Sequence, residues 1–328
     1  MGPPRISLLL PVRDGEATLG RALASLERQT LRDFEVVCVD DGSRDATAGI
    51  LERQAARDPR FRLVRQPHLW IARALNRALE ESRAPVVARQ DADDVSHPRR
   101  LERVLAFLEA RPDVDAAGSR TLGFPRAALG IGMRRYEAWQ NSLRSHEEMR
   151  RERFVESPMS QGGAAFRRRA LEAAGGWRDE PWPEDLDLWL RLFAAGRRVE
   201  KLPEVLYFWG EHPRRTTRRD PRLGAAAHRA CKLRHLGEGF LRAGVPVELW
   251  GRGRLLGSWA RSLEEAGHPV RAREIDPRCV ARGGARALPA RPDGPLLVAL
   301  TAPVSRSHLR AALAEAGLEE ERDWLFVL

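Results

Sequence analysis

Three apolar runs near the start of the chain constrain its fold more than any other feature. They are Ile6–Val12, Phe34–Val39 and Pro85–Val87, and none of them alternates with polar residues. Such runs are typical of strands buried on both faces of a parallel sheet. Stretches that predict amphipathic helices lie between and after them, at 17–29, 46–56, 71–82 and 99–110. This alternation predicts right-handed βαβ units and an α/β fold with an open, doubly wound, mostly parallel sheet.

Polar and acidic residues follow each of these runs. Arg13 comes after the first run, Asp40 and Asp41 after the second, and Asp91–Asp94 after the third. Ligands of doubly wound sheets bind at the carboxyl ends of the strands, so one site is expected there. Three crowded carboxylates repel one another unless a cation lies among them, and Mg²⁺ or Mn²⁺ shared with a diphosphate suits such oxygen ligands. The alternative is a solvated acidic turn that caps the next helix.

The composition is that of an ordinary soluble protein with a basic balance. The chain has 328 residues and a net charge of +10, and its three cysteines are scattered. The charge suits phosphate-rich ligands or an anionic membrane surface, whereas no basic helix or aromatic RNA-binding signature indicates nucleic acid. The cysteines indicate neither a disulfide framework nor a zinc site. With no signal peptide or membrane-spanning run in the sequence, we expect a cytoplasmic location, which leaves room for peripheral contact with the inner face of the cell membrane.

Four segments together resemble the inverting family-2 glycosyltransferases, which have the GT-A fold. The segments are Ile6–Glu16, Val39–Ser43, Asp91–Asp94 and Glu184–Trp189, and they occur in the family's order and spacing. The resemblance covers residues 1 to about 220. It implies a GT-A domain, a nucleotide-sugar donor that is usually UDP-linked and sometimes GDP- or dTDP-linked, and a divalent cation, Mn²⁺ or Mg²⁺.

The resemblance also implies roles for individual residues in nucleotide binding. Pro11 and Arg13 would lie against the base, and Asp41 would accept a hydrogen bond from its ring N–H. Asp91 would hold the ribose. Arg73 would approach the base or a phosphate, and its alternative role is that of an exposed helix arginine. A carboxylate only accepts hydrogen bonds, so it recognises donor groups or cations.

Two positions depart from the family's pattern. Trp70 stands before the 71–82 helix, where the family often has a glycine. This departure either narrows the nucleotide pocket or provides a stacking surface. Gln161-Gly162 stands where relatives often carry a His-Pro pair.

The metal and the catalytic base are assigned in the same way. Asp93 would ligate the metal, and His212, after a predicted strand at 205–209, matches a histidine that the family often has there. A lone histidine is more often structural, which is the alternative for His212. Asp185 resembles the family's catalytic base, with Glu184 orienting it or touching the acceptor.

Local sequence adds two arguments about these residues. Glu184 and Asp185 precede a predicted helix at 186–195, whose dipole favours a charged carboxylate in the first turn. Ordinary enrichment of acids at helix starts is the alternative. The loop formed by Arg214, Arg215, Thr216 and Thr217 is suited to closing over a diphosphate.

The C-terminal part predicts a second, smaller unit. We divide the chain into a GT-A domain at 1–221, a helical connector at 222–244 and a Rossmann-like domain at 245–328. Gly251, Gly253 and Gly257 approach a dinucleotide fingerprint but miss its spacing by one residue, and Asp276 ends the next strand. The unit holds few strands, so an appendage for assembly, including homo-oligomers, or for partner docking is favoured over an NAD site.

The sequence therefore predicts a metal-dependent inverting glycosyltransferase. It would move a sugar from a nucleotide-sugar to a hydroxyl of a saccharide or lipid-linked acceptor. The family's usual setting is polysaccharide, lipopolysaccharide or glycolipid assembly. The first alternative is a catalytically inactive nucleotide-binding or scaffolding protein on the same fold. A second alternative, an NAD-dependent oxidoreductase, lacks a catalytic constellation beside Gly251.

Overall fold

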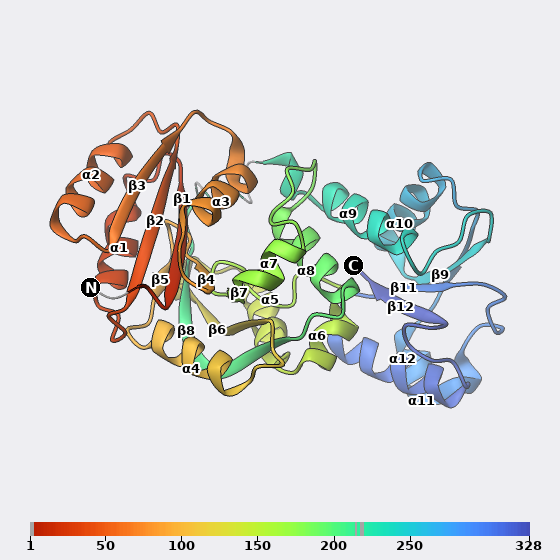
Figure 1. Cartoon of the computed structure of the whole chain (residues 1–328). Helices are drawn as coiled ribbons and strands as arrows, with labels where there is room; N and C mark the ends of the chain where they lie inside the picture. Colours follow the sequence, from red (N-terminus) through yellow and green to blue (C-terminus); the bar gives the residue numbers. More distant parts are fainter. Residues whose placement is uncertain (1–2, 214, 217–219) are drawn as a thin grey trace. The chain divides into compact units, whose positions relative to one another are not determined.

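The computed structural model describes residues 3–213, 215–216 and 220–328, and these form two compact units (Figure 1). Unit 1 takes in 1–149, 158–180 and 187–219, and unit 2 takes in 150–157, 181–186 and 220–328. Among the described residues, no helix is both long and apolar enough to cross a membrane. Each unit has a sheet of its own.

Unit 1 is built on an eight-stranded, mostly parallel sheet in the order β3-β2-β1-β4-β7-β6-β8-β5. The first four strands of that order run parallel to one another. β7 is antiparallel to both of its neighbours, β6 and β8 are parallel, and β5 is antiparallel to β8. The doubly wound, mostly parallel sheet is thereby confirmed. The strands are β1 (Ile6–Val12), β2 (Phe34–Asp41), β3 (Phe61–Gln66), β4 (Val86–Arg89), β5 (Val95–Ser96), β6 (Ala116–Phe124), β7 (Ala165–Arg167) and β8 (Val199–Gly210).

Helices cover both faces of this sheet because alternate side chains of each strand point to opposite faces. In β1, Leu8 and Leu10 pack in one core cluster with residues of α1, α2 and α4. Leu9 packs in the other cluster with residues of α3 and α8. The helices of this part of the chain are α1 (Leu19–Glu27), α2 (Thr47–Arg57), α3 (Trp70–Glu81), α4 (Arg100–Ala110), η1 (Arg126–Ala128), α5 (Ile131–Ser142), α6 (His146–Glu152), α7 (Arg168–Ala173) and α8 (Glu184–Ala194).

Two strands extend beyond the ranges that the sequence predicts. β2 continues through Asp40 and Asp41, which pair in register with Arg65 and Gln66 of β3. β8 begins six residues earlier than its apolar core suggests, because its pairing with β6 carries it from Val199 onward. Aspartate and lysine are poor strand formers, so pairing with a neighbouring strand overrides local propensity at both places.

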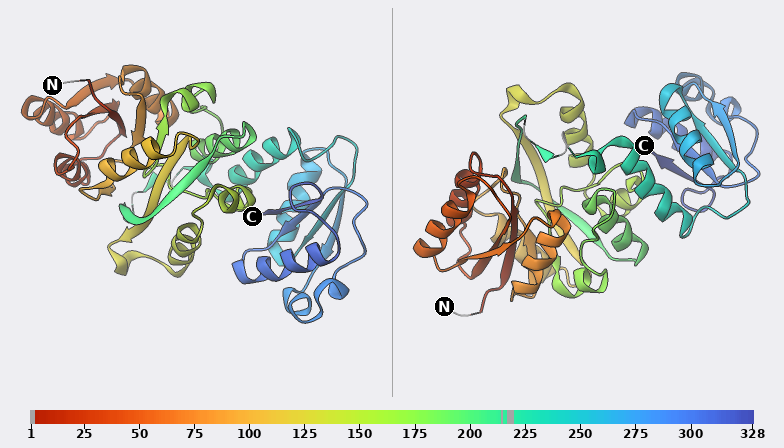
Figure 2. Two further views of the ribbon diagram at one scale, coloured as in Figure 1. Left: turned by 60° about the horizontal axis from the view of Figure 1, so that its bottom comes forward. Right: turned by 90° about the horizontal axis from the view of Figure 1, so that it is seen from above.

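Unit 2 contains a four-stranded, fully parallel sheet in the order β10-β9-β11-β12. Figure 2 shows this sheet at the blue end of the chain. Its strands are β9 (Val247–Gly251), β10 (Val270–Glu274), β11 (Leu296–Ala299) and β12 (Trp324–Val327). Its helices are η3 (Pro221–Leu223), α9 (Ala225–Gly237), α10 (Gly253–Glu265), α11 (Pro277–Gly283), η4 (Gly284–Ala287) and α12 (Pro303–Glu315).

Buried charges join the 150–157 segment to the rest of unit 2. Glu152 accepts hydrogen bonds from Arg306 Nη2 and Arg310 Nη2, both at 3.0 Å. The buried Lys232 Nζ donates to the backbone oxygen of Val155 at 2.9 Å. A short segment from the middle of the chain thus packs with the C-terminal sheet, which a linear division at residue 221 does not represent. The three-part division stays a prediction.

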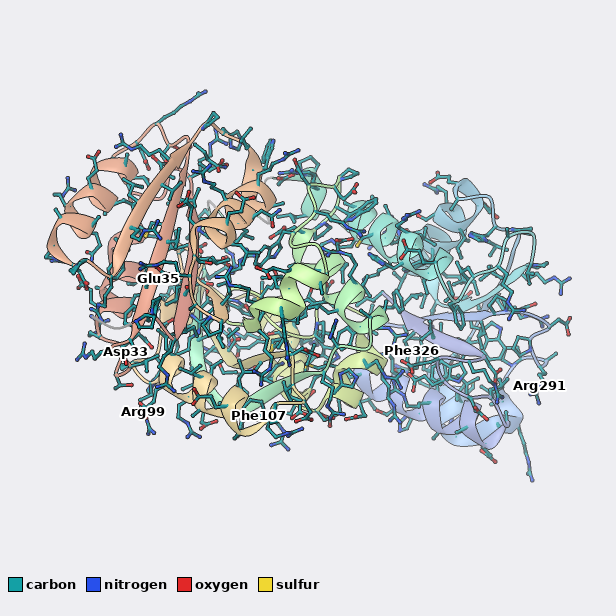
Figure 3. The ribbon with its side chains drawn as sticks, in the orientation of Figure 1. Asp33, Glu35, Arg99, Phe107, Arg291 and Phe326 are labelled. Carbon is teal, nitrogen blue, oxygen red and sulfur yellow. The ribbon has the colours of Figure 1, made fainter. Side chains whose placement is uncertain are left out.

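A buried acid also fixes the start of the sheet in unit 1. Glu35 of β2, labelled in Figure 3, accepts hydrogen bonds from Ser7 Oγ and the backbone N–H of Arg83, each at 2.7 Å. Burial alone would raise the pKa of Glu35, but these donors and the Arg83 guanidinium lower it below its ordinary value. The charged carboxylate therefore ties β1 and β2 to the segment that leads into β4.

Lys201 is a buried cation in β8. Its Nζ donates to the backbone oxygens of Gln140 at 2.5 Å and Pro158 at 2.9 Å. Burial, assisted by the nearby charge of Arg120, lowers the pKa of Lys201 to about 7. A neutral amine still donates both hydrogen bonds, so the folded state favours the deprotonated form.

The lowered pKa of Lys201 predicts a pH-dependent stability. Above pH 7 the folded protein has lost this proton, whereas the unfolded chain keeps it up to the ordinary value of 10.5. Stability therefore rises with pH in this window, by up to about 1.4 kcal/mol per pH unit. Between pH 7 and 9, we expect the free energy of unfolding of wild type, measured in urea, to rise relative to that of Lys201→Met. Parallel pH curves for the two proteins would contradict this.

Candidate active site

The carboxyl end of β1 places Arg13 next to a histidine that follows β3. Arg13 comes directly after the strand, and its Nη1 lies 2.9 Å from His68 Nε2. His68 Nδ1 lies 2.8 Å from Asp41 Oδ2 at the end of β2. Arg13 donates to Nε2, so the imidazole carries its proton on Nδ1 and donates to Asp41. Pro11, the other predicted base contact, is buried within β1 opposite Val39.

Asp41 has four hydrogen-bond donors within unit 1. Gln66 Nε2 and the N–H of Leu69 donate to Oδ1, at 2.7 and 2.8 Å. The His68 ring and the N–H of Trp70 donate to Oδ2, at 2.8 and 3.0 Å. A carboxylate has about four lone-pair positions, so this arrangement uses them all. The predicted contact of Asp41 with a base N–H stays a prediction, and it needs one of these donors to move.

The turn that Asp41 holds has an unusual backbone. Trp70, the first residue of α3, has a φ of 72°, in the left-handed region that favours glycine. Arg73 lies in the first turn of the same helix and is exposed, and its Nε donates to Asp179 Oδ2 at 3.2 Å. This contact agrees with the alternative interpretation of Arg73 as an exposed helix arginine.

The carboxyl end of β4 positions Asp91, the predicted ribose ligand. Arg89 Nε donates to Asp91 Oδ1 at 2.7 Å, and Tyr207 Oη accepts from the Asp91 N–H at 3.2 Å. Gly162 lies against the same carboxylate, because a Cβ at that position would be 2.6 Å from Asp91 Oδ2. The departure at Gln161-Gly162 is therefore part of this site.

Three further residues complete the surroundings of Asp91. The sequence analysis missed Arg89 and Trp177, and it named Gln161 only as a departure from the family's pattern. Gln161 Oε1 accepts from Arg89 Nη1 at 3.2 Å and from Trp177 Nε1 at 2.5 Å. Arg89 and Trp177 are both buried. The sequence signals were the position of Arg89 beside the acidic run and the departure at Gln161. Trp177 reaches the site through the tertiary structure.

The fully buried Arg100 ties the acidic segment to its neighbours. It donates to Gln90 Oε1 at 3.0 Å and Ser96 Oγ at 2.8 Å, on either side of the acids. It also donates to the backbone oxygens of Arg89 at 2.7 Å and Gly162 at 3.2 Å. Burial lowers the pKa of Arg100, while the charges of Tyr207, Asp91 and Asp94 act in the opposite direction. The guanidinium sets the shape of the loop and supplies charge to balance the carboxylates.

The structure brings the two predicted metal ligands together. His212 Nε2 lies 3.0 Å from Asp93 Oδ2, and both side chains are partly exposed. Two ligand atoms bound side by side at about 2.1 Å from an octahedral ion lie about 3 Å apart. Carboxylate oxygen and imidazole nitrogen are both ligands for Mn²⁺. These residues therefore fit the predicted cation.

Asp94 adds a buried carboxyl group to this edge. Its Oδ1 accepts the N–H of Gly210 at 2.8 Å, while Oδ2 has no hydrogen-bond partner within the described part of the chain. Burial, with the charges of Asp93 and Asp91, raises the pKa of Asp94 well above its ordinary value. A buried carboxyl beside two others indicates a place where added positive charge is favourable.

Arg215 supplies part of that positive charge. Its Nη1 lies 4.0 Å from Glu211 Oε2. Burial alone would lower the pKa of Arg215, but the charges of Asp94, Asp93 and Glu211 raise it. Of the predicted closing loop, Arg215 and Thr216 are among the described residues, and Arg214 and Thr217 lie outside them.

Glu184 and Asp185 open α8, as the sequence predicts, and pack with unit 2. Asp185 is partly exposed, and its Oδ1 accepts the N–H of Leu186 at 2.7 Å. Ser157 Oγ donates to Asp185 Oδ2 at 3.4 Å. Glu184 is buried. A carboxylate in the first turn of a helix is stabilised in its charged form, as a base requires.

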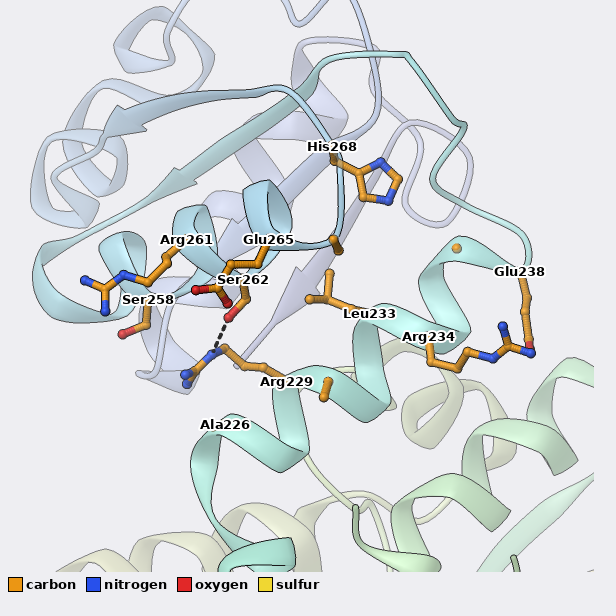
Figure 4. A pocket seen from close by; sticks show the side chains of 13 residues that line it. Ala226, Arg229, Leu233, Arg234, Glu238, Ser258, Arg261, Ser262, Glu265 and His268 are labelled. Carbon is orange, nitrogen blue, oxygen red and sulfur yellow. Dashed lines mark hydrogen bonds and ion pairs between the residues drawn. The ribbon is translucent and has the colours of Figure 1, made fainter. Parts of the chain in front are cut away.

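Unit 2 contains a pocket of about 730 Å³ between α9 and α10 (Figure 4). Two of its arginines have partners: Arg229 Nε donates to Ser262 Oγ at 3.2 Å, and Arg234 forms an ion pair with Glu238. None of the predicted site residues lines it. Elsewhere in the unit, Asp276 caps α11 by accepting the N–H of Arg278 at 2.9 Å, so this carboxylate has a structural role.

The fold and this edge define a class of protein. An open, mostly parallel sheet with acidic and basic residues at the carboxyl ends of its strands is the architecture of a nucleotide-binding α/β domain. The family model "Glycosyl transferase family 2" matches residues 7–175, and the chain belongs to that family. The amylovoran biosynthesis glycosyltransferase AmsE of Erwinia amylovora is 30% identical over 189 residues, which are 57% of this chain and 68% of AmsE.

Solved structures agree on the fold. S. aureus TarS 1–349 in complex with UDP-GlcNAc superposes with a TM-score of 0.59 at 17% identity, over 73% of this chain and 68% of TarS. The mannosyltransferase PcManGT from Pyrobaculum calidifontis, in complex with GDP-Man and Mn²⁺, gives a TM-score of 0.53 at 22% identity. That match covers 72% of this chain and 63% of PcManGT. The GT-A fold that the sequence predicts is thus confirmed.

The four donors on Asp41 predict a structural effect of its substitution. Asp41→Asn puts an amide NH₂ in place of one acceptor, and donors in this buried turn lose their partner. We expect a loss of about 2 kcal/mol in the free energy of unfolding, measured in urea. Asp40→Asn is the matched control, since Asp40 accepts the N–H of Ser43 and a smaller loss is expected. Equal losses in the two variants would contradict the role given to Asp41.

Proposed function

We propose that this family-2 glycosyltransferase is metal-dependent and inverting, and that it uses a nucleotide-sugar donor. The observation that supports this best is the 3.0 Å separation of Asp93 Oδ2 and His212 Nε2. The two residues come from segments 119 residues apart in sequence, after β4 and after β8. Asp91 and Arg215 contribute charge around them, and Asp94 contributes a further carboxyl group.

Different strand ends of unit 1 would bind different parts of the donor. Arg13 would lie at the base, Asp91 at the ribose, and Asp93 with His212 at the diphosphate. Arg89 holds the Asp91 carboxylate in place at 2.7 Å. A Mn²⁺ or Mg²⁺ bound by Asp93 and His212 would supply positive charge against the negative charge that develops on the departing diphosphate. Arg215 would add to that charge.

Asp185 is the proposed general base. Its partly exposed carboxylate at the start of α8 would accept the proton of an acceptor hydroxyl as that oxygen attacks the anomeric carbon. The bond from the anomeric carbon to the diphosphate oxygen breaks in the same step, and in-line attack inverts the anomeric centre. Ser157 Oγ, 3.4 Å from Asp185 Oδ2, and the neighbouring Glu184 would orient the base.

The donor and acceptor classes are also proposals. The solved structures of similar fold hold UDP-GlcNAc in TarS and GDP-Man in PcManGT, and a UDP-linked sugar is our first expectation. The acceptor would be a saccharide or lipid-linked hydroxyl in polysaccharide, lipopolysaccharide or glycolipid assembly. The net charge of +10 would suit an anionic membrane surface from the cytoplasmic side. Unit 2 would serve assembly or partner docking.

The metal site predicts a linked requirement for metal and nucleotide. In thermal unfolding with UDP, GDP or dTDP, we expect wild type to be stabilised by one of them only when Mn²⁺ is present. Asp93→Ala and His212→Ala should each lose that shift, because each removes one ligand. Asp33→Ala, an exposed aspartate labelled in Figure 3, is the control and should keep it. An increase in unfolding temperature that a nucleotide produces without Mn²⁺ and also in Asp93→Ala would contradict metal dependence.

The base assignment predicts a loss of catalysis with donor binding retained. Asp185→Asn keeps the size of the side chain but cannot accept the acceptor's proton. We expect transfer to fall by about 10²- to 10⁴-fold, the usual contribution of a general base, while nucleotide affinity is unchanged. Donor consumption assayed with a panel of acceptors, beside calorimetric binding of the nucleoside diphosphate, measures both. Full transfer by this variant would exclude Asp185 as the base.

A further inference from the structure

Trp70 combines strain with exposure. Its φ of 72° lies in the left-handed region, where a side chain with a Cβ is strained and glycine is not. The residue is 45% exposed, so the fold does not place it there to fill the core. Non-glycine residues held in such conformations cluster at ligand-binding sites, where the surrounding structure enforces them.

The surroundings of Trp70 enforce this conformation. The N–H groups of Leu69 and Trp70 both donate to the buried Asp41 carboxylate, at 2.8 and 3.0 Å. The His68 ring lies beside the indole, with ring centroids 4.4 Å apart, and is itself held between Asp41 and Arg13. The backbone of Gly42 packs against the turn, since a Cβ there would be 2.8 Å from His68 N. A rigid turn therefore holds the indole in place.

The location indicates what the indole meets. Arg13, Asp41 and His68 come from the carboxyl ends of β1, β2 and β3, where a doubly wound sheet binds its ligand. The metal-binding pair follows β4 and β8, and the strand order β3-β2-β1-β4 separates β3 from β4 by three strand spacings, roughly 14 Å. A ligand with phosphates at β4 therefore places its other end at β2 and β3.

We propose that Trp70, supported by His68, stacks on the nucleobase of the donor, and that Asp41 is a positioning residue for the turn that presents the indole. This inference rests on the proposed function. All four lone-pair positions of Asp41 are used inside the protein, whereas the indole offers a flat apolar surface that suits any base. Stacking on the indole therefore supplies affinity at this end.

Calorimetric titration with ligands that have or lack a base tests this. The ligands are UDP, GDP and inorganic pyrophosphate, each with Mn²⁺, and the proteins are wild type, Trp70→Gly, Trp70→Phe and Leu69→Ala. We expect Trp70→Gly to bind the nucleoside diphosphate about tenfold more weakly or worse, and Trp70→Phe to keep most of the affinity. Leu69→Ala is the matched control, because Leu69 is 42% exposed and adjacent, and it should bind as wild type does. Pyrophosphate should bind all four proteins alike.

Thermal unfolding of the same variants separates stacking from a structural role. Glycine adopts the φ of Trp70 without strain, so Trp70→Gly should unfold at the same temperature as wild type or higher. A lower unfolding temperature, an equal loss of pyrophosphate affinity, or unchanged nucleotide affinity would each overturn the stacking role. If wild type binds pyrophosphate but neither nucleotide more tightly, the base site and the proposed donor fail together. If wild type binds a nucleotide more tightly than pyrophosphate and Trp70→Gly binds it equally well, stacking fails and the donor assignment stands.

Discussion

The arrangement of unit 1 depends on how it accommodates carboxylates at the end of β4. Asp91, Asp93 and Asp94 are crowded at a buried strand end, where their mutual repulsion is large unless positive charge lies close by. The protein provides that charge with Arg89 and Arg100, both buried. Arg100 also bonds to Gly162, so the balance of charge links β4 to the segment that leads into β7. Asp91 is held by Arg89, Asp94 stays buried, and Asp93 lies against His212.

This arrangement divides the sheet edge into two ends with different chemistry. At β4 and β8 the groups are carboxylates, an imidazole and arginine, which suit a cation and phosphates. At β1, β2 and β3 one carboxylate, Asp41, holds a turn through its hydrogen bonds, and the indole of Trp70 in that turn is 45% exposed. A nucleotide has the same division along its length, with an apolar planar base at one end and charged phosphates at the other.

Much of this site could be predicted from sequence because it is local. Apolar runs give the strands, and the residues immediately after each run must lie at the same edge of a parallel sheet, which is why Arg13, Asp41 and Asp93 share that edge. Distant contributors carried weaker signals. His212 was found only by resemblance, Gln161 was named only as a departure from the family's pattern, and Trp177 was missed. The contacts of Gln161 with Arg89 and Trp177 exist only once β7 and the turn before α8 have packed.

The sequence by itself determined the alternation of strands and helices, the sheet edge that carries the acids, and the family. These follow from side-chain periodicity and from short motifs, which need no knowledge of distant contacts. Only the tertiary structure decided which groups donate to Asp41 and why Trp70 has a left-handed φ that favours glycine. It also decided that the 150–157 segment belongs to the C-terminal unit. Hydrogen-bond saturation and charge balance depend on every group within a few ångströms, and chain order does not specify those neighbours.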